Sequence, residues 1–467
     1  MSINFLSKQV VVFGAGRSGL AATNLLLQYG AEVILTDDAS FEELPLLKAF
    51  DKIDHAKLTL KLCGDRPIIS KDSCAALILS PGISYEHPLV KAALDQGISI
   101  LNEIDLAYLF LGGCFKSPSA LLKYSQAVMY DRIHSLPSRA FRLADGLLKQ
   151  PLIIGITGTN GKSTTTVMLG QILASSGFKV FFGGNLGEPL CSMIVNQPHN
   201  DFDYIVLELS SYQLEALHLI NLDMAVILNI TPDHLDRYGS LAHYQKAKLA
   251  IKKLLKPEGT LFIHEELASL LDDMNRVQFF NQGSLDLVQN LGVRGEHNRE
   301  NALAAASCAR ALGVPDNLIK ESLLNYKALP HRCELIAQKS GITFINDSKG
   351  TTVEAVKKAL SMVEGPVQLL LGGLAKGDDF SELLPKAFPF IEGYHVYGQA
   401  KPKILSELSG AKTYAYENLS EAFKGALCHA KVGHTILLSP GCASFDQFTD
   451  FNARGEHFRS LVEALCA

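Results

Sequence analysis

The chain has 467 residues, of which 47% are hydrophobic and 19% charged, and its formal net charge is −5. This length favours about three domains, and the lack of a basic excess argues against a nucleic-acid-binding protein. No run approaches the roughly 20 apolar residues of a membrane-spanning helix, and the first apolar run, residues 10–13, is too short for a signal peptide. The nine cysteines include no C-x-x-C pair, so we expect reduced thiols and a cytoplasmic location.

Short β-rich runs alternate with helix-compatible stretches along most of the chain, which predicts an α/β fold with parallel sheets. We expect strands at residues 10–13, 33–36, 76–79, 98–101, 152–154, 204–207, 225–228, 342–344, 368–371, 395–397 and 435–438. The segment at about 111–149 is less regular, and its two amphipathic stretches predict a helical insertion remote from the chemistry. The predicted domains are residues 1–103, 104–329 (with the insertion) and 330–467.

The first expected strand runs into the glycine-rich loop 14–19, and Asp37 ends the second. This spacing is typical of a dinucleotide-binding fold, in which a pyrophosphate lies at the helix start and an acid contacts a nucleoside. From these residues alone the ligand stays open between NAD, FAD and another nucleotide diphosphate. A strand–helix turn without a ligand is the alternative.

The most specific motif follows the strand 152–154, where residues 155–164 read Gly-Ile-Thr-Gly-Thr-Asn-Gly-Lys-Ser-Thr. Backbone N–H groups of such a loop and the following helix N-terminus form an anion site. Lys162 can reach the outer phosphates of a nucleotide, and the Ser163 hydroxyl can bind Mg²⁺. The spacing is tighter than the usual P-loop, because Gly155 falls outside it. The predicted phosphate contacts are Gly158, Thr159, Asn160, Gly161, Lys162, Ser163 and Thr164.

Three further residues of the second block are candidate site residues. Glu208 ends the strand 204–207, where it is placed to bind Mg²⁺ as a Walker-B carboxylate does. The role of His234 is not decided by the sequence: it could be a metal ligand, a base or an ordinary loop histidine. Mg²⁺ prefers oxygen ligands, which argues against a histidine ligand. Residue type alone favours Lys248 as a surface lysine of a basic helix.

In the third block, three polar loops follow expected strands, where open α/β sheets bind ligands. They span residues 347–352, 372–377 and 441–446. Lys349, Thr351, Lys376 and Ser444 suit an anionic substrate. We interpret Cys442 as a structural thiol, since no partner histidine is identifiable.

These motifs, in this order, resemble those of the Mur ligase family, the ATP-dependent amino-acid ligases of peptidoglycan precursor synthesis. The family signals are residues 157–164, 184–187, 295–302 and 330–332. Within the family, the chain is most similar to the branch that adds D-glutamate. That similarity lies in residues 80–84, 207–215, 347–351, 438–440 and 452–455. Gly350, Thr352 and Phe445 depart from the residues common in the family, and the insertion has no counterpart there.

The resemblance implies a Rossmann-like UDP-binding domain, a central P-loop ATPase domain and a C-terminal Rossmann-like domain. It implies ligation of D-glutamate to UDP-N-acetylmuramoyl-L-alanine through an acyl phosphate, with ATP and two Mg²⁺ ions as cofactors. These small molecules are the expected partners, without nucleic acid or a membrane span, and we expect a monomer.

The resemblance also assigns residues to roles. Catalytic roles fall to Lys162, His234 and Lys248. The expected metal ligands are Ser163, Glu208, His234 and Lys248, the last as a carbamate. The further nucleotide contacts are Asn298, Asn301, Arg332 and Asp347. The UDP-substrate contacts are Gly14, Ala15, Gly16, Arg17, Ser18, Asp37, Ser80, Gly82, Asn185 and Ser210. The D-glutamate contacts are Lys349, Thr351, Lys376, Ser444, Phe445 and Phe451.

Three other functions stay open on the motifs alone. The nearest is a sister ligase that takes meso-diaminopimelate, L-alanine or a folate-type substrate. An NAD(P)-dependent oxidoreductase would explain residues 14–19 but leaves the loop 157–164 unused. A P-loop motor or switch protein would hydrolyse ATP without an amino acid and would not need the first nucleotide fold.

Overall fold

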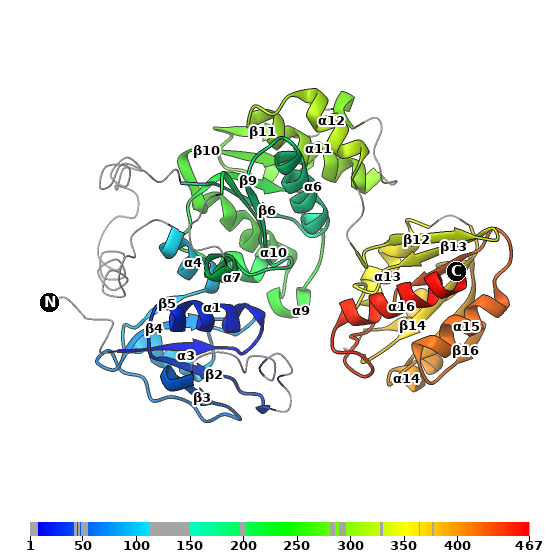
Figure 1. Ribbon diagram of the computed structural model, residues 1–467, viewed down its shortest axis with the longest axis horizontal. Helices are drawn as coiled ribbons and strands as arrows, with labels where there is room; N and C mark the ends of the chain where they lie inside the picture. The colour runs from blue at the N-terminus through cyan, green and yellow to red at the C-terminus, as the bar shows by residue number, and fades with distance from the viewer. Residues whose placement is uncertain are drawn as a thin grey trace. The chain divides into compact units, whose positions relative to one another are not determined.

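The structure is a computed structural model that describes residues 8–41, 44, 47, 55–111, 150–196, 202–280, 285–288, 296–326, 330–363, 365–375 and 378–466. The chain forms two compact units: Met1–Gly292 with Glu296–Tyr326, and Val293–Gly295 with Lys327–Ala467. Three sheets with flanking helices are visible (Figure 1), two in the first unit and one in the second. Apart from Leu111, the predicted helical insertion lies outside the described residues.

The first sheet has the order β3-β2-β1-β4-β5, and all its strands are parallel. Its strands are β1 (Gln9–Phe13), β2 (Val33–Thr36), β3 (Leu58–Lys61), β4 (Cys74–Leu79) and β5 (Ser99–Leu101). Its helices are α1 (Arg17–Gln28), α3 (Pro88–Asp95) and α4 (Glu103–Leu111). The chain passes from β2 on one side of β1 to β4 on the other, so the strand order reverses there. The carboxyl ends of strands at such a reversal are where open sheets bind ligands.

The second sheet is also parallel and has the order β11-β10-β9-β6-β8-β7. Its strands are β6 (Leu152–Thr157), β7 (Val180–Gly184), β8 (Tyr204–Glu208), β9 (Leu222–Ile227), β10 (Leu255–Ile263) and β11 (Val277–Phe279). Its helices are α6 (Lys162–Ser175), α7 (Leu190–Asn196), α8 (Ser211–Ala216), α9 (Leu235–Tyr238), α10 (Leu241–Leu249), α11 (Glu296–Ala311) and α12 (Asp316–Leu324). Gly155 lies inside β6, where a Cβ atom would approach Leu222 Cδ1 to 2.7 Å. This glycine therefore serves core packing and not the phosphate loop.

Two buried carboxylates of α4 join the first sheet to the second. Asp105 accepts hydrogen bonds from the backbone N–H groups of His218, Leu219 and Ile220, at 3.0, 2.9 and 3.2 Å. Glu103 accepts one from the Cys191 N–H at 2.5 Å, at the start of α7. Burial raises the pKa of Glu103 to about 7. One apolar core runs continuously through both sheets' helices, so the two sheets form one body.

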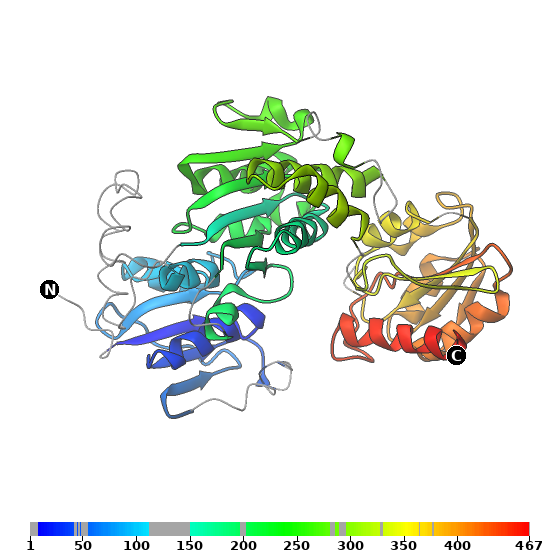
Figure 2. The same cartoon turned by 45° about the horizontal axis from the view of Figure 1, so that its top comes forward.

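The second unit contains a sheet of order β12-β13-β17-β14-β15-β16, in which only the β12–β13 pair is antiparallel. Its strands are β12 (Glu334–Lys339), β13 (Ile342–Asn346), β14 (Val367–Gly372), β15 (Ile391–Tyr397), β16 (Thr413–Ala415) and β17 (Thr435–Leu438). Its helices are α13 (Val353–Leu360), α14 (Lys401–Glu407), α15 (Leu419–His429) and α16 (Phe451–Cys466). Figure 2 shows α15 and α16 against this sheet. Buried side chains lie on both faces, as parallel sheets require.

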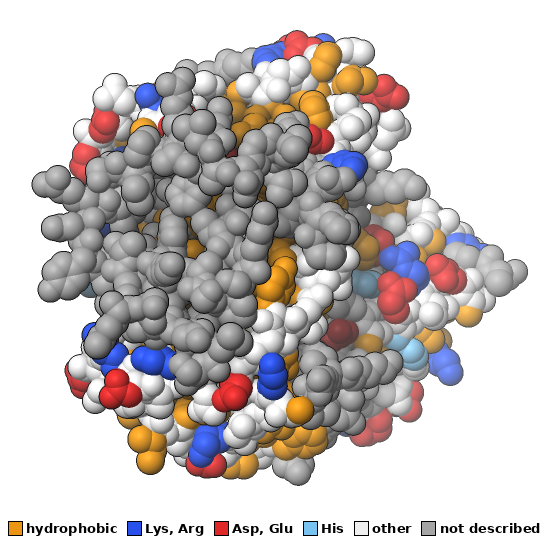
Figure 3. All heavy atoms as spheres, turned by 60° about the vertical axis from the view of Figure 1, so that its left-hand side comes forward, with side chains coloured by type: hydrophobic (Ala, Val, Ile, Leu, Met, Phe, Trp, Pro, Cys, Tyr) orange, Lys and Arg blue, Asp and Glu red, His pale blue; other side chains and the backbone are white. Residues whose placement is uncertain are grey.

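The predicted fold class, an α/β chain built on parallel sheets, is confirmed. No helix among the described residues is long and apolar enough to cross a membrane. On the face in Figure 3, acidic and basic side chains are mixed over the described surface. The cysteines that the structure describes are free thiols.

Candidate active site

The loop between β6 and α6 depends on glycine at position 161 and is covered by the side chain of Lys162. Gly161 has φ +80°, and a Cβ atom there would lie 2.0 Å from Asn301 Oδ1, so only glycine fits. The Lys162 ammonium donates to the carbonyls of Gly158 and Thr159, both at 2.8 Å. The lysine thus folds back over the loop, where its charge and the N-terminus of α6 favour phosphate oxygens.

The segment after β9 holds this loop in place. Asn229 accepts from the Thr159 N–H through its carbonyl and from the Asn160 N–H through Oδ1, both at 2.9 Å. The Thr159 hydroxyl donates to the Thr231 carbonyl at 3.1 Å. These contacts engage the backbone N–H groups of Thr159 and Asn160 and fix the loop's conformation.

Glu208, at the end of β8, is the centre of an oxygen-rich cluster. Its buried carboxylate accepts from the Ser163 hydroxyl through Oε2 and from Asn185 Nδ2, at 2.6 Å, through Oε1. The three residues come from the end of β8, the start of α6 and the turn after β7. A carboxylate beside a hydroxyl and an amide offers the oxygen donors that Mg²⁺ prefers, so these residues fit the metal that the sequence implies.

Lys248 is buried, with only 1% of its surface exposed. The surface position that was predicted from its residue type is therefore wrong. Its Nζ donates to the Gly158 carbonyl at 2.8 Å and lies 4.7 Å from the centroid of the Tyr244 ring. Burial, reinforced by the nearby charge of Lys162, lowers the pKa of Lys248 to about 6. At neutral pH this lysine is therefore largely an uncharged amine beside the phosphate loop.

His234 lies in the turn before α9 with φ +53°, a conformation that costs energy in a residue with a side chain. Its ring centroid lies 5.2 Å from that of Tyr212 and 6.1 Å from that of Tyr244. The Tyr244 hydroxyl in turn donates to Thr159 Oγ1 at 3.3 Å. The structure thus connects His234, through Tyr244, with the phosphate loop and Lys248.

Most predicted UDP contacts meet at the carboxyl edge of the first sheet. Asp37 Oδ2 accepts from the Ala15 N–H at 2.7 Å, and its Oδ1 accepts from the Ala39 N–H at 3.0 Å. The Ser80 hydroxyl donates to the Gly14 carbonyl at 3.0 Å. The Asp37 carboxylate thus fixes the glycine-rich loop, while Gly16, Arg17 and Ser18 follow at the start of α1.

Arg17 links this edge to the second sheet. Its Nη1 donates to the Gly187 carbonyl at 3.2 Å, in the same turn as Asn185. Asn185 also donates to Glu208. The turn 185–187 therefore contacts both Arg17, next to the first glycine-rich loop, and the carboxylate that is suited to a metal. Ser210, in contrast, caps α8, because its hydroxyl accepts from the Gln213 N–H at 3.3 Å. Gly82, with φ +98°, lies in the exposed turn after β4.

Sequence reasoning missed a second cluster at this edge. The Asp38 carboxylate forms an ion pair with Arg66 Nη2 at 3.4 Å and lies 3.0 Å from His87 Nε2. His87 Nδ1 also accepts from the Leu89 N–H, which caps α3. The only sequence signal was His87-Pro88 at a helix start, a pattern that marks a helix cap more often than a ligand contact.

The second unit gathers the predicted D-glutamate contacts around the ends of β13, β14 and β17. The Lys349 ammonium lies 4.9 Å from the centroid of the Phe451 ring. Ser444 is buried, Phe445 is 62% exposed, and Thr351 is partly buried in the loop before α13. Lys376 lies outside the described residues.

Asp347 is buried beside these contacts. It accepts from the Ser439 hydroxyl at 2.6 Å and the Cys333 N–H at 3.2 Å, and burial raises its pKa to about 6. Burial also raises the pKa of Cys442 to about 12, which leaves this thiol inert at neutral pH.

The predicted adenine-nucleotide contacts are divided between the two units. Asn301 and Asn298 both lie on α11, with Asn301 against Gly161 of the phosphate loop. Arg332 and Asp347 belong to the second unit.

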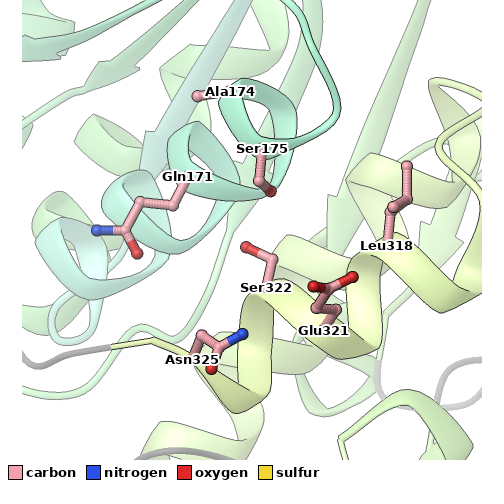
Figure 4. Close-up of a pocket in the computed structure, with 7 residues that line it drawn as sticks. All are labelled: Gln171, Ala174, Ser175, Leu318, Glu321, Ser322 and Asn325. Atoms are coloured by element: carbon pink, nitrogen blue, oxygen red, sulfur yellow. The ribbon is translucent and has the colours of Figure 1, made fainter.

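A hollow of about 350 Å³ lies between α6 and α12. Figure 4 shows the side chains that line it: Gln171, Ala174, Ser175, Leu318, Glu321, Ser322 and Asn325. It is at the C-terminal end of α6, whereas Lys162 begins that helix, so the hollow is separate from the phosphate loop.

Comparison with known proteins is consistent with this arrangement. The chain matches the Mur ligase MurD-like N-terminal domain over residues 8–102, the Mur ligase middle domain over 156–278, and the Mur ligase glutamate ligase domain over 331–442. Two similar relatives are the UDP-N-acetylmuramoylalanine--D-glutamate ligases of Pelotomaculum thermopropionicum (33% identical) and Protochlamydia amoebophila (34% identical), each aligned over 99% of both chains. The MurF ligase from Thermotoga maritima in complex with ADP superposes with a TM-score of 0.55 over 99% of this chain and 100% of that chain. At 14% identity that likeness speaks for the fold alone.

Proposed function

Because this chain belongs to the Mur ligase family, we propose that it joins D-glutamate to UDP-N-acetylmuramoyl-L-alanine with ATP as the energy source. The observation that carries the proposal is the phosphate loop beside the Glu208 cluster. It lies in a chain that aligns with D-glutamate ligases over nearly its whole length. The products are the D-glutamyl conjugate, ADP and phosphate, in peptidoglycan precursor synthesis in the cytoplasm.

The chemistry explains why the reaction needs ATP. A carboxylate is a poor electrophile, and ATP supplies a phosphoryl group that turns the alanyl carboxylate into an acyl phosphate. The amine of D-glutamate then attacks the acyl carbon, and the tetrahedral intermediate collapses to the amide with loss of phosphate. Lys162 and the N–H groups of the loop offset the negative charge on the transferring phosphoryl oxygens.

We expect two Mg²⁺ ions, one at Glu208 and one at Lys248. Ser163 and Glu208 would hold one ion near the nucleotide phosphates. His234 and Lys248 would hold the second once Lys248 carries a carbamate, which supplies anionic oxygen donors in place of an amine. The low pKa of Lys248 supports this modification, because carbon dioxide adds only to an unprotonated amine.

Each substrate has its own platform in this proposal. Residues 1–103 hold the UDP part of the substrate, residues 104–329 hold ATP, and residues 330–467 hold D-glutamate. Asn185 lies between the first two platforms, since Arg17 bonds its turn and Glu208 accepts from its amide. We expect the protein to work as a monomer.

The direct test is a phosphate-release and product assay with Mg-ATP, UDP-N-acetylmuramoyl-L-alanine and a panel of amino acids. Release that requires both the UDP substrate and D-glutamate is the expected result. Equal turnover with L-alanine or meso-diaminopimelate would favour a sister ligase. Turnover without any amino acid would favour a nucleotide-driven switch. Lys162→Met is the matched inactive control, because it removes the ammonium without shortening the side chain greatly.

A further inference from the structure

Three loops of the second unit carry the predicted D-glutamate contacts, apart from Phe451. Loop A is residues 347–352, loop B is residues 372–375, which lead to Lys376, and loop C is residues 439–446. Loop C bonds loop A through the Gly441 N–H and the Gly350 carbonyl, at 2.8 Å. It bonds loop B through a two-way pair between Leu374 and Ala443, at 2.8 and 3.0 Å. The loops therefore form one connected surface.

Arg454, on the first turn of α16, lies behind this surface and bonds all three loops. Its Nε donates to the Ser348 hydroxyl at 3.0 Å, and its Nη2 donates to the Ser348 carbonyl at 2.8 Å. Nη2 also donates to the Cys442 carbonyl at 3.1 Å, and Nη1 donates to the Gly372 carbonyl at 3.4 Å. Ser348 donates in turn to the carbonyl of Phe451 at 2.8 Å. One side chain thus connects loops A, B and C with the start of α16.

Arg454 forms no ion pair with any residue that the structure describes, although the charge of Asp446, in loop C, acts on two of its neighbours, Tyr397 and Cys442. Its side chain is fully buried, and its contacts among the described residues are to uncharged acceptors. A guanidinium does not lose its proton in a protein, and a buried, unpaired cation is costly. Its place in the first turn of α16 adds to the cost, because the N-terminus of a helix disfavours a positive charge.

Close packing shows that the surrounding loops are built around the guanidinium. A Cβ atom on Gly373 would lie 3.1 Å from Arg454 Nη1 and 2.2 Å from the Ala443 carbonyl oxygen. Loop B can therefore approach loop C and Arg454 only with glycine at this position. An apolar side chain that filled the same space would avoid the free-energy cost of burying a charge. The presence of a cation here therefore points to a role for its charge.

We propose that Arg454 is a positioning residue for the amino-acid substrate. It sets the placement of loops A, B and C relative to one another, and its buried charge favours the binding of a dianionic amino acid at their surface. Without touching the ligand, it adds to the positive charge of Lys349 on loop A. This inference rests on the proposed function, which assigns D-glutamate to these loops.

A purely structural role makes a different prediction. If Arg454 only stabilised the fold, its loss would lower the melting temperature and the yield of active enzyme, and the KM values of the three substrates would change little or together. If it positions the loops and supplies charge, the KM for D-glutamate would change selectively. Lysine in its place would keep the charge without the forked geometry, so it would restore part of the affinity.

The test compares Arg454→Gln, Arg454→Lys and Ser348→Ala with Arg459→Gln as the matched control. Arg459 lies on the same helix, and its ion-pair partner at 2.6 Å is Glu334 of β12, which belongs to none of the three loops. Initial rates give the KM for each substrate, and thermal unfolding reports stability. We expect Arg454→Gln to raise the KM for D-glutamate about 10- to 100-fold, and the KM for ATP and for the UDP substrate by less than about threefold. Arg454→Lys and Ser348→Ala should give smaller, equally selective increases, and Arg459→Gln none.

A folded Arg454→Gln variant with an unchanged KM for D-glutamate, or with equal changes for all three substrates, would overturn the proposal. If that variant does not fold, an unchanged KM for D-glutamate in both Arg454→Lys and Ser348→Ala would overturn it instead. These outcomes can be told apart from a failure of the proposed function. In that case the unmodified protein would release phosphate without depending on D-glutamate.

Discussion

The buried amine of Lys248 allows a quantitative prediction about its modification. With a pKa of about 6, about 99% of this lysine is uncharged at pH 8, against about 0.3% for a lysine with the ordinary pKa of 10.5. Carbon dioxide adds to the lone pair of the neutral amine, a nitrogen–carbon bond forms, and the amine releases one proton to give a carbamate anion. Burial therefore raises the reactive fraction about 300-fold at this pH.

The assay follows the return of activity after dissolved carbon dioxide has been removed. Carbon dioxide is then restored at one fixed dissolved concentration, at several pH values between 6 and 9, and the rate of reactivation is measured. Since the amine is already about half neutral at pH 6, we expect the rate to rise only about twofold by pH 9. A lysine with an ordinary pKa would react about tenfold faster with each pH unit. Such a steep rise would refute the argument from burial.

Substitution tests the same lysine independently. Lys248→Ala should lose activity, and a short carboxylic acid should restore part of it by supplying the missing carboxylate. Lys246→Ala is the matched control, because Lys246 is an exposed residue of the same helix and should be dispensable. Full activity of Lys248→Ala without the added acid would rule out the carbamate.

Three further predictions concern other groups. Glu208→Gln removes the charge that Ser163 and Asn185 surround, so we expect kcat to fall by at least about 100-fold; an unchanged Mg²⁺ dependence of the initial rate would contradict this. Asp37→Asn keeps at most one of the two bonds to the backbone, so the KM for the UDP substrate should rise roughly tenfold, while the KM for ATP, measured in the same assay, stays constant. Burial lowers the pKa of His395 to about 3, below its unfolded value near 6.5, so the stability from keeping it neutral is present above pH 6.5 and is lost as the pH falls toward 3. The free energy of unfolding, measured with urea, should fall by about 2 kcal/mol between pH 7.5 and pH 5. His395→Gln should reduce that fall, and an equal fall in the variant would show that another group titrates.

The sequence predicted the central strands because they are continuous apolar runs. β1, β6, β14 and β17 are buried on both faces, and such strands are recognised by hydrophobicity alone. The strands that were missed are β3, β7, β10, β11, β12 and β16. All of these except β10 lie at a sheet edge, where one face meets solvent and the apolar pattern weakens. β10 contains Pro257 and Gly259, with a register shift between Leu255 and Thr260, which hides it among turn residues.

The residues of the candidate site also differ in how far the sequence could predict them. The loop 157–163 and Glu208 were predictable, because glycine spacing and the position of an acid after a strand are local features. Lys248 was not predictable from its residue type, because its side chain is buried against groups distant in sequence, such as the Gly158 carbonyl. Arg454 gave no signal beyond its family motif, since its partners lie in three separate loops. The domain boundaries at 103/104 and 329/330 stay predictions.

Lys248 and Arg454 show why the identity of a buried cation matters. Both side chains are almost fully buried, and both donate to backbone carbonyls. Lysine can escape the cost of burial by releasing its proton, and the product is a nucleophile that can take up carbon dioxide. Arginine has no such escape, because a guanidinium does not lose its proton in a protein, so its charge persists and must be balanced by neutral acceptors and an arriving anion. The two residue types are therefore not interchangeable: arginine at 248 could not form a carbamate, and lysine at 454 would keep the charge but could not bond three loops at once.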